Sequence, residues 1–165
     1  MKMNSSIITR YFRWFVPSTT FLQSLLLLVI RLYWGWEFFL TGKGKLMDLE
    51  RPAAFFQSLG IPFPYAQAIL AGATECFGGL LLLAGFCSRL ISLPLTILLT
   101  VAYLTADLDK VKMIVSDPDK FLGADEFLFL FVVVIVFVFG PGKFSVDWLI
   151  KRRVAPPSSE SVWID

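Results

Sequence analysis

Four long apolar runs, separated by polar connections, constrain this chain more than any other feature of its sequence. They lie at residues 21–40, 65–86, 90–106 and 121–139. Each is near the ~20 residues that an α-helix needs to cross about 30 Å of hydrocarbon. Apolar residues make up 56% of the chain and charged residues only 17%, which is an apolar excess for a water-soluble domain. The sequence therefore predicts an all-α fold, an integral membrane antiparallel four-helix bundle.

One domain accounts for the chain, with a polar segment at each end. We expect residues 1–20 to form a basic interfacial N-terminal segment, 21–148 the four-helix transmembrane domain, and 149–165 a basic and then disordered cytoplasmic tail. An even number of spans places both termini on one side of the membrane. Because that side carries the larger share of Lys and Arg, the positive-inside rule predicts a multi-pass protein of the inner membrane with both termini in the cytoplasm.

Two absences in the composition exclude whole classes of function. The net charge is only +2, with no extended basic stripe, so we expect no nucleic-acid partner. The chain has no His, which removes His-ligated haem, His-based metal sites and the commonest general base. We expect no metal site and no intrinsic cofactor, and the lipid bilayer is the expected environment.

The informative residues are two charges in the middle of apolar runs. Arg31 falls halfway along the first run and Glu75 halfway along the second. Each would cost about 2.5–3.5 kcal/mol at the bilayer centre if unpaired. Since the midpoints of antiparallel neighbours share one depth, we expect Arg31 and Glu75 to form a buried ion pair. This pair would either fix the helix register alone or line a polar pocket for an acidic or redox-active small molecule.

Other charges lie at the predicted helix ends. Asp107 and Asp109 end the third run, and with Lys45 they are candidates for the mouth of such a pocket. At the opposite ends of the spans, Arg89 opens the third run and Asp147 follows the fourth. We expect a structural Arg89–Asp147 pair that ties the C-terminal segment to the hairpin between the second and third runs.

Several of these motifs together resemble the DoxX family of small four-helix membrane proteins. The resemblance covers roughly residues 25–148, and its most specific element is the octapeptide GPGKFSVD at 140–147. Its other elements are Arg31-Leu32 with Gly35, Gly42 to Lys45, Phe56 with Leu59-Gly60-Ile61-Pro62, Glu75 with Gly78-Gly79, Gly85, and Ser88-Arg89. Many relatives look as if they carry a His where this chain has Thr41, so a His-dependent role does not transfer to it.

The resemblance implies membrane subunits of quinone-linked oxidoreductases as the functional neighbourhood. Under this hypothesis Arg31, Lys45 and Glu75 bind a quinone or a small sulfur anion between helices, and Glu75 is the catalytic proton carrier. Because no flavin, nicotinamide or CxxC motif is present, electrons would come through a bound quinone or a redox partner subunit. The alternatives are a non-catalytic anchor or assembly factor, and a small-solute carrier that would need to be a homo-oligomer.

Overall fold

The structure, a computed structural model, describes the backbone of residues 5–154, and side chains from residue 19 onward except that of residue 125. Within this range the chain is helical and contains no strand. The helices are α1 (Ser5–Met47), α2 (Glu50–Ser58), α3 (Pro64–Ala84), α4 (Ser88–Ala106), α5 (Leu108–Lys112), α6 (Pro118–Leu122), α7 (Asp125–Phe139) and α8 (Val146–Val154).

Three of these helices are long and apolar enough to cross a membrane. They are α1 over Thr19–Met47, α3, and α4. The predicted all-α membrane fold is confirmed to this extent. The fourth predicted span, 121–139, corresponds mainly to α7, which has 15 residues. At a rise of about 1.5 Å per residue α7 extends about 22 Å, which is less than the ~30 Å hydrocarbon core.

The first helix differs most from its predicted limits. Instead of beginning near residue 21 after a separate segment, α1 begins at Ser5, and it ends at Met47 rather than at Leu40. The extra turns at its C-terminal end carry Lys45 into the helix. A short connection then leads into α2, which packs against α3.

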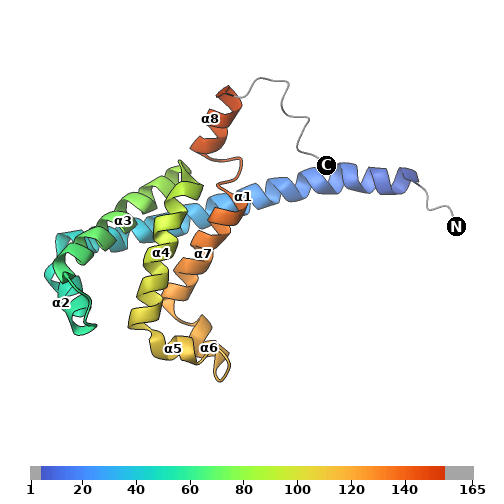
Figure 1. Ribbon diagram of the computed structural model, residues 1–165. Coiled ribbons are helices and arrows are strands. Elements are labelled where there is room, and N and C mark those ends of the chain that lie inside the picture. Colours follow the sequence, from blue (N-terminus) through green and yellow to red (C-terminus); the bar gives the residue numbers. More distant parts are fainter. Residues whose placement is uncertain (1–4, 155–165) are drawn as a thin grey trace.

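The helices associate mainly as two pairs, α1 with α3 and α4 with α7 (Figure 1). Glycines form the contact between α1 and α3. A Cβ at Gly79 would lie 2.6 Å from the carbonyl oxygen of Gly35, and a Cβ at Gly42 would collide with the backbone of Cys76. Small residues let membrane helices approach closely without loss of packing, so these positions fix the register of α1 against α3.

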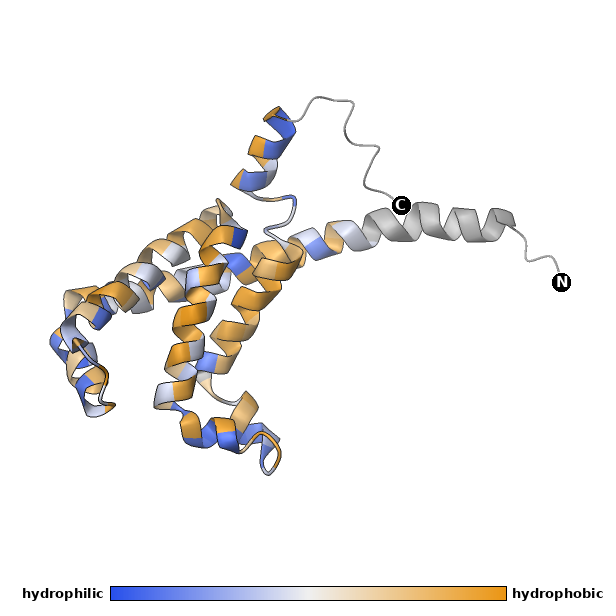
Figure 2. Ribbon diagram, viewed as in Figure 1, coloured by the Kyte–Doolittle hydropathy of each residue, from blue (hydrophilic) through white to orange (hydrophobic). Residues whose placement is uncertain are grey.

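Apolar side chains, rather than glycines, fill the contact between α4 and α7. The buried cluster there contains Leu95, Leu99, Val133 and Val136, and Phe38 and Leu82 join it to the first pair. Figure 2 shows apolar residues along α4 and α7, and polar residues concentrated in α2, α5, α6 and α8. Most charged residues of the described chain therefore lie near the ends of the long helices.

After α7 the chain returns to the turn between α3 and α4 and continues into α8. The Asp147 N–H donates to the Gly85 carbonyl at 3.0 Å. Ser145 starts α8 by accepting the N–H of Trp148 at 3.1 Å. The basic residues of the predicted tail, Lys151 to Arg153, form the last turn of this helix. The disorder predicted for the rest of the tail falls on 155–165, outside the described residues.

Candidate functional site

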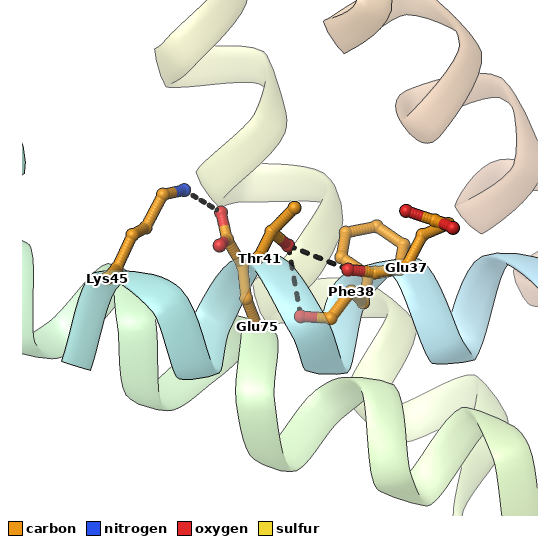
Figure 3. A network of polar contacts seen from close by, with 5 residues as sticks. All are labelled: Glu37, Phe38, Thr41, Lys45 and Glu75. Carbon is orange, nitrogen blue, oxygen red and sulfur yellow. Dashed lines mark hydrogen bonds and ion pairs between the residues drawn. The ribbon is translucent and has the colours of Figure 1, made fainter. Parts of the chain in front are cut away.

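The buried carboxylate of Glu75 is paired with Lys45. The Lys45 ammonium lies 2.5 Å from Glu75 Oε1, and Figure 3 shows the two side chains meeting between α1 and α3. Glu75 is only 4% exposed, yet its second oxygen, Oε2, has no hydrogen-bond partner. A buried carboxylate oxygen without a donor is costly, and such an atom marks a place where a ligand or a proton gains binding energy.

A cavity of about 620 Å³ opens beside this pair, between the end of α1 and α2. Lys45 belongs to its wall, so one side chain links the cavity to the buried carboxylate. The other lining residues are Thr41, Gly44, Asp48, Arg51, Pro52 and Phe55. The cavity wall therefore combines two cations, Lys45 and Arg51, with the Asp48 carboxylate and an apolar edge.

The sequence analysis missed Arg51 and Asp48 as lining residues. Asp48 Oδ1 accepts the N–H of Arg51 at 3.4 Å, and both residues lie where α1 passes into α2. The available signal was the spacing of Lys45, Asp48 and Arg51 at intervals of three residues, which places all three on one side if the helix continues. We had instead predicted the end of the helix at Leu40.

The predicted Arg31–Glu75 ion pair is not formed. Arg31 is 1% exposed, and its guanidinium donates to backbone carbonyls: Nη1 to Leu82 at 3.4 Å and Nη2 to Phe144 at 2.5 Å. Arg31 and Lys45 lie about 20 Å apart along α1 at a rise of about 1.5 Å per residue. The structure thus brings together Lys45 and Glu75, and places Arg31 elsewhere.

The glycine register explains why the predicted pair fails. With Gly35 beside Gly79, and Gly42 beside Cys76, Glu75 faces the second half of α1. Arg31 then reaches the end of α3, where a Cβ on Gly85 would collide with its guanidinium. The midpoints of the two apolar runs do not face each other, because α1 is much longer than α3 and extends beyond it. Matching the glycines of the two helices would have given the correct register.

The predicted Arg89–Asp147 ion pair is also not formed, although the connection it was meant to explain exists. The Asp147 carboxylate accepts the N–H groups of Cys87 at 2.7 Å and of Ser88 at 3.0 Å. Arg89 Nη2 instead donates to the Val138 carbonyl at 3.3 Å. A carboxylate at a helix N-terminus satisfies free N–H groups and the helix dipole, so Asp147 caps α4 from a distant part of the chain.

Asp107 and Asp109 do not join Lys45 at the cavity. Asp107 lies 3.0 Å from the Lys110 ammonium and Asp109 lies 3.8 Å from Lys112. A hydrogen bond from the side chain of Glu126 lowers the pKa of Asp107 below its usual range, and the Lys110 ammonium acts in the same direction. Asp107 therefore connects the end of α4 to the start of α7 through Glu126, whereas the Asp109–Lys112 pair lies within α5.

Thr41 lines the cavity, but its hydroxyl is engaged by its own helix. It donates to the carbonyls of Glu37 and Phe38, each at 3.0 Å (Figure 3). The Lys45 ammonium and the Arg51 guanidinium are therefore the donors on the cavity wall that remain to meet an acceptor. Oxygen acceptors, such as a quinone carbonyl or an oxyanion, suit this donor set.

These features define a class: a small helical integral membrane protein with a partly buried ion pair between glycine-packed helices. The DoxX family profile matches residues 26–108, just over half of the chain. The chain belongs to the DoxX family. The matched region contains Arg31, Lys45, Glu75 and Arg89, while Asp147 lies beyond it. Searches of curated proteins and of solved structures gave no match.

Proposed function

We propose that this chain is a membrane subunit of a quinone-linked oxidoreductase system, with the cavity at the end of α1 as its quinone head-group site. The observation that carries the proposal is the Lys45–Glu75 pair: the Glu75 carboxylate is buried and keeps one oxygen without a partner, and Lys45 lines a cavity of about 620 Å³. Lys45 and Arg51 are the donors for a carbonyl oxygen, and Pro52 and Phe55 supply an apolar edge for the ring.

The residues divide the chemistry as follows. A quinone accepts two electrons and two protons to become a quinol, and the electrons would come from a partner subunit that carries a flavin or a dithiol. Lys45 orients the acceptor oxygen and stabilises negative charge on it. Lys45, which lines the cavity, would give one proton to the reduced quinone and regain a proton through its contact with Glu75, and the second proton would come from water at the open side of the cavity.

The membrane arrangement belongs to the same proposal. We place α7 in the bilayer beside α4, with residues 121–124 extending its apolar length, so that the chain crosses four times. Both termini and α8 then lie on the cytoplasmic side of an inner membrane, and the cavity faces the other side. Cysteine labelling at exposed positions such as Ser58 and Val154, in sealed and opened vesicles, tests this orientation.

Quinone binding to the purified full-length chain tests the function. A short-chain benzoquinone is titrated into protein in lipid nanodiscs, and bound quinone is measured after organic extraction. We expect saturable binding that weakens about 10-fold or more in Lys45→Met, since a charge-assisted hydrogen bond contributes about 1.5–3 kcal/mol. Lys43→Met, an exposed Lys two residues away, is the matched control and should bind as the wild type does.

Other outcomes separate the alternatives. If thiosulfate displaces the quinone from the same site, the ligand class widens to small sulfur oxyanions. If no saturable binding occurs, or if Lys45→Met binds as tightly as the wild type, the proposal fails. The anchor function would then be favoured, because the backbone contacts of Arg31 are those of a purely structural group.

A further inference from the structure

We propose that a second site, at the start of α4, binds the head group of an anionic phospholipid. A cavity of about 440 Å³ lies there between the α3–α4 turn, the segment after α7, and α8. Its lining includes two cations from different elements, Arg89 and Lys151, together with Trp148. This site is separate from the cavity at the end of α1.

The charges in the cavity favour an anion. Asp147 is the carboxylate among the lining residues, and both of its oxygens already accept backbone N–H groups of Cys87 and Ser88. Arg89 is exposed and uses one nitrogen for the Val138 carbonyl, and Lys151 is exposed. The two side chains therefore retain donors for phosphate oxygens, and Arg is suited to phosphate by its forked geometry.

The position of α8 indicates a membrane surface. Its last turn carries Lys151, Arg152 and Arg153, while Leu149, Ile150 and Val154 are exposed apolar residues. The Arg152 guanidinium lies 5.3 Å from the centre of the Trp148 ring. A short helix with basic residues, exposed aliphatic residues and a Trp is typical of an element lying at the level of the head groups.

A lipid is favoured over a free anion because the cavity continues into an apolar stripe. Leu90 belongs to the cavity wall, and Leu93, Ile97 and Val101 follow it on one side of α4, each at least 46% exposed. From Leu90 to Val101 the helix rises about 16 Å, about half of the ~30 Å hydrocarbon core. That length matches the acyl chains of one leaflet, so head group and tails are accommodated together.

The test compares lipids on the full-length protein in detergent by native mass spectrometry. We expect retention of a phosphatidylglycerol molecule and little retention of phosphatidylcholine. Since each basic residue near the surface contributes a comparable share of the attraction to anionic lipid, Arg89→Gln/Lys151→Gln should bind phosphatidylglycerol roughly 30-fold more weakly. Lys43→Gln/Lys112→Gln removes the same charge from exposed residues that lie outside α8 and do not line the cavity, and it should bind as the wild type does.

Because Arg89 also donates to the Val138 carbonyl, its replacement could disturb folding. A second variant that leaves Arg89 in place separates lipid binding from folding. Lys151 makes no such hydrogen bond to another helix among the described residues, and Lys151→Gln alone should weaken binding roughly 5-fold. The proposal is overturned if Lys151→Gln and the double variant both bind as the wild type does, or if the two lipids are retained equally. Displacement of phosphatidylglycerol by millimolar inorganic phosphate would also overturn it, since the site would then be one for free anions.

Discussion

Arg31 and Lys45 lie on the same helix, about 20 Å apart at a rise of about 1.5 Å per residue, and they differ in burial and in the groups that they contact. Arg31 is enclosed, donates to two backbone carbonyls, and lines neither of the two cavities described above. Lys45 is partly exposed, pairs with a carboxylate that keeps a free oxygen, and lines a cavity. Burial of a charge alone therefore does not identify a binding site. The partners of the charge distinguish structure from function.

The nature of the partners gives the physical reason. The carbonyls of Leu82 and Phe144 are fixed parts of the backbone at the end of α3 and after α7. A guanidinium that donates to them holds those segments together and has little capacity left, since only Nε lacks a partner. A lysine–carboxylate pair can open, exchange a proton or accept a third group. The pair on α1 and α3 is thus the better candidate for chemistry.

Replacement of Arg31 should give the largest loss of stability. Arg31→Met removes two charge-assisted hydrogen bonds and leaves the Phe144 carbonyl without its Arg31 donor, while the Leu82 carbonyl still accepts the Gly85 N–H, so we expect a loss of about 3 kcal/mol. Thermal unfolding in detergent, followed by near-UV circular dichroism, measures it. Lys43→Met, an exposed substitution on the same helix, serves as the control. A loss below about 1 kcal/mol would show that Arg31 does not hold the two segments together.

Replacement of the whole Lys45–Glu75 pair should affect binding far more than stability. A buried ion pair exchanged for apolar residues is often neutral, so Lys45→Met/Glu75→Leu should unfold within about 1 kcal/mol of the wild type. The single variant Lys45→Met should cost more than the double, because it leaves the Glu75 carboxylate alone. Denaturant titration of the wild type, the double variant and both single variants, Lys45→Met and Glu75→Leu, gives the coupling energy. If the double variant were as unstable as Arg31→Met, the proposed difference between a structural Arg31 and a functional Lys45 would be contradicted.

Replacement of Asp147, a structural residue like Arg31, should cause a smaller loss of stability than replacement of Arg31. Asp147→Asn keeps the shape but removes the negative charge from the start of α4, and we expect a loss of about 1 kcal/mol. Asp147 also interacts electrostatically with Arg31, so the loss should shrink when Arg31 is already replaced. A double-mutant cycle measures that coupling, with the exposed Asp119→Asn as control. Strict additivity would contradict a shared Arg31–Asp147 environment.

Thr41 should give the smallest effect, although it lines the cavity. Its hydroxyl hydrogen is directed to carbonyls of α1, so Thr41→Val should change stability by no more than about 0.5 kcal/mol. Quinone affinity should stay within about 2-fold of the wild type for the same reason. Equilibrium binding in nanodiscs checks this value. A loss comparable to that of Lys45→Met would place Thr41 among the ligand donors.

The sequence predicted the three helices that are long and apolar enough to cross a membrane, because apolar length is a local property. It also identified Arg31 and Glu75 as unusual, because charge in hydrocarbon is costly wherever it occurs, whereas Lys45 was predicted as a residue at the mouth of a pocket. It did not predict their partners, since partnership depends on the register of α1 against α3. That register is set by the close contacts of Gly35, Gly42 and Gly79, whereas we had inferred it from the midpoints of two apolar runs.

The contacts that the segment after α7 makes with α1 and α4 were only partly predictable from the sequence. The octapeptide at 140–147 stood out in the sequence, and Asp147 was expected near the start of α4. A side chain that caps backbone N–H groups 59 and 60 residues away leaves no trace in spacing or periodicity. The same holds for Phe144, which contacts Arg31 through its carbonyl oxygen, a group that every residue possesses. Hydrogen bonds to backbone groups are therefore the contacts of this fold that the sequence did not predict.

The long-range bond between Arg31 and Phe144 has a consequence for biosynthesis. Arg31 is translated 113 residues before the carbonyl to which it donates. During insertion the first helix consequently carries a guanidinium whose final acceptor has not yet left the ribosome. The packing around Arg31 can therefore be completed only after residue 144 has been synthesised.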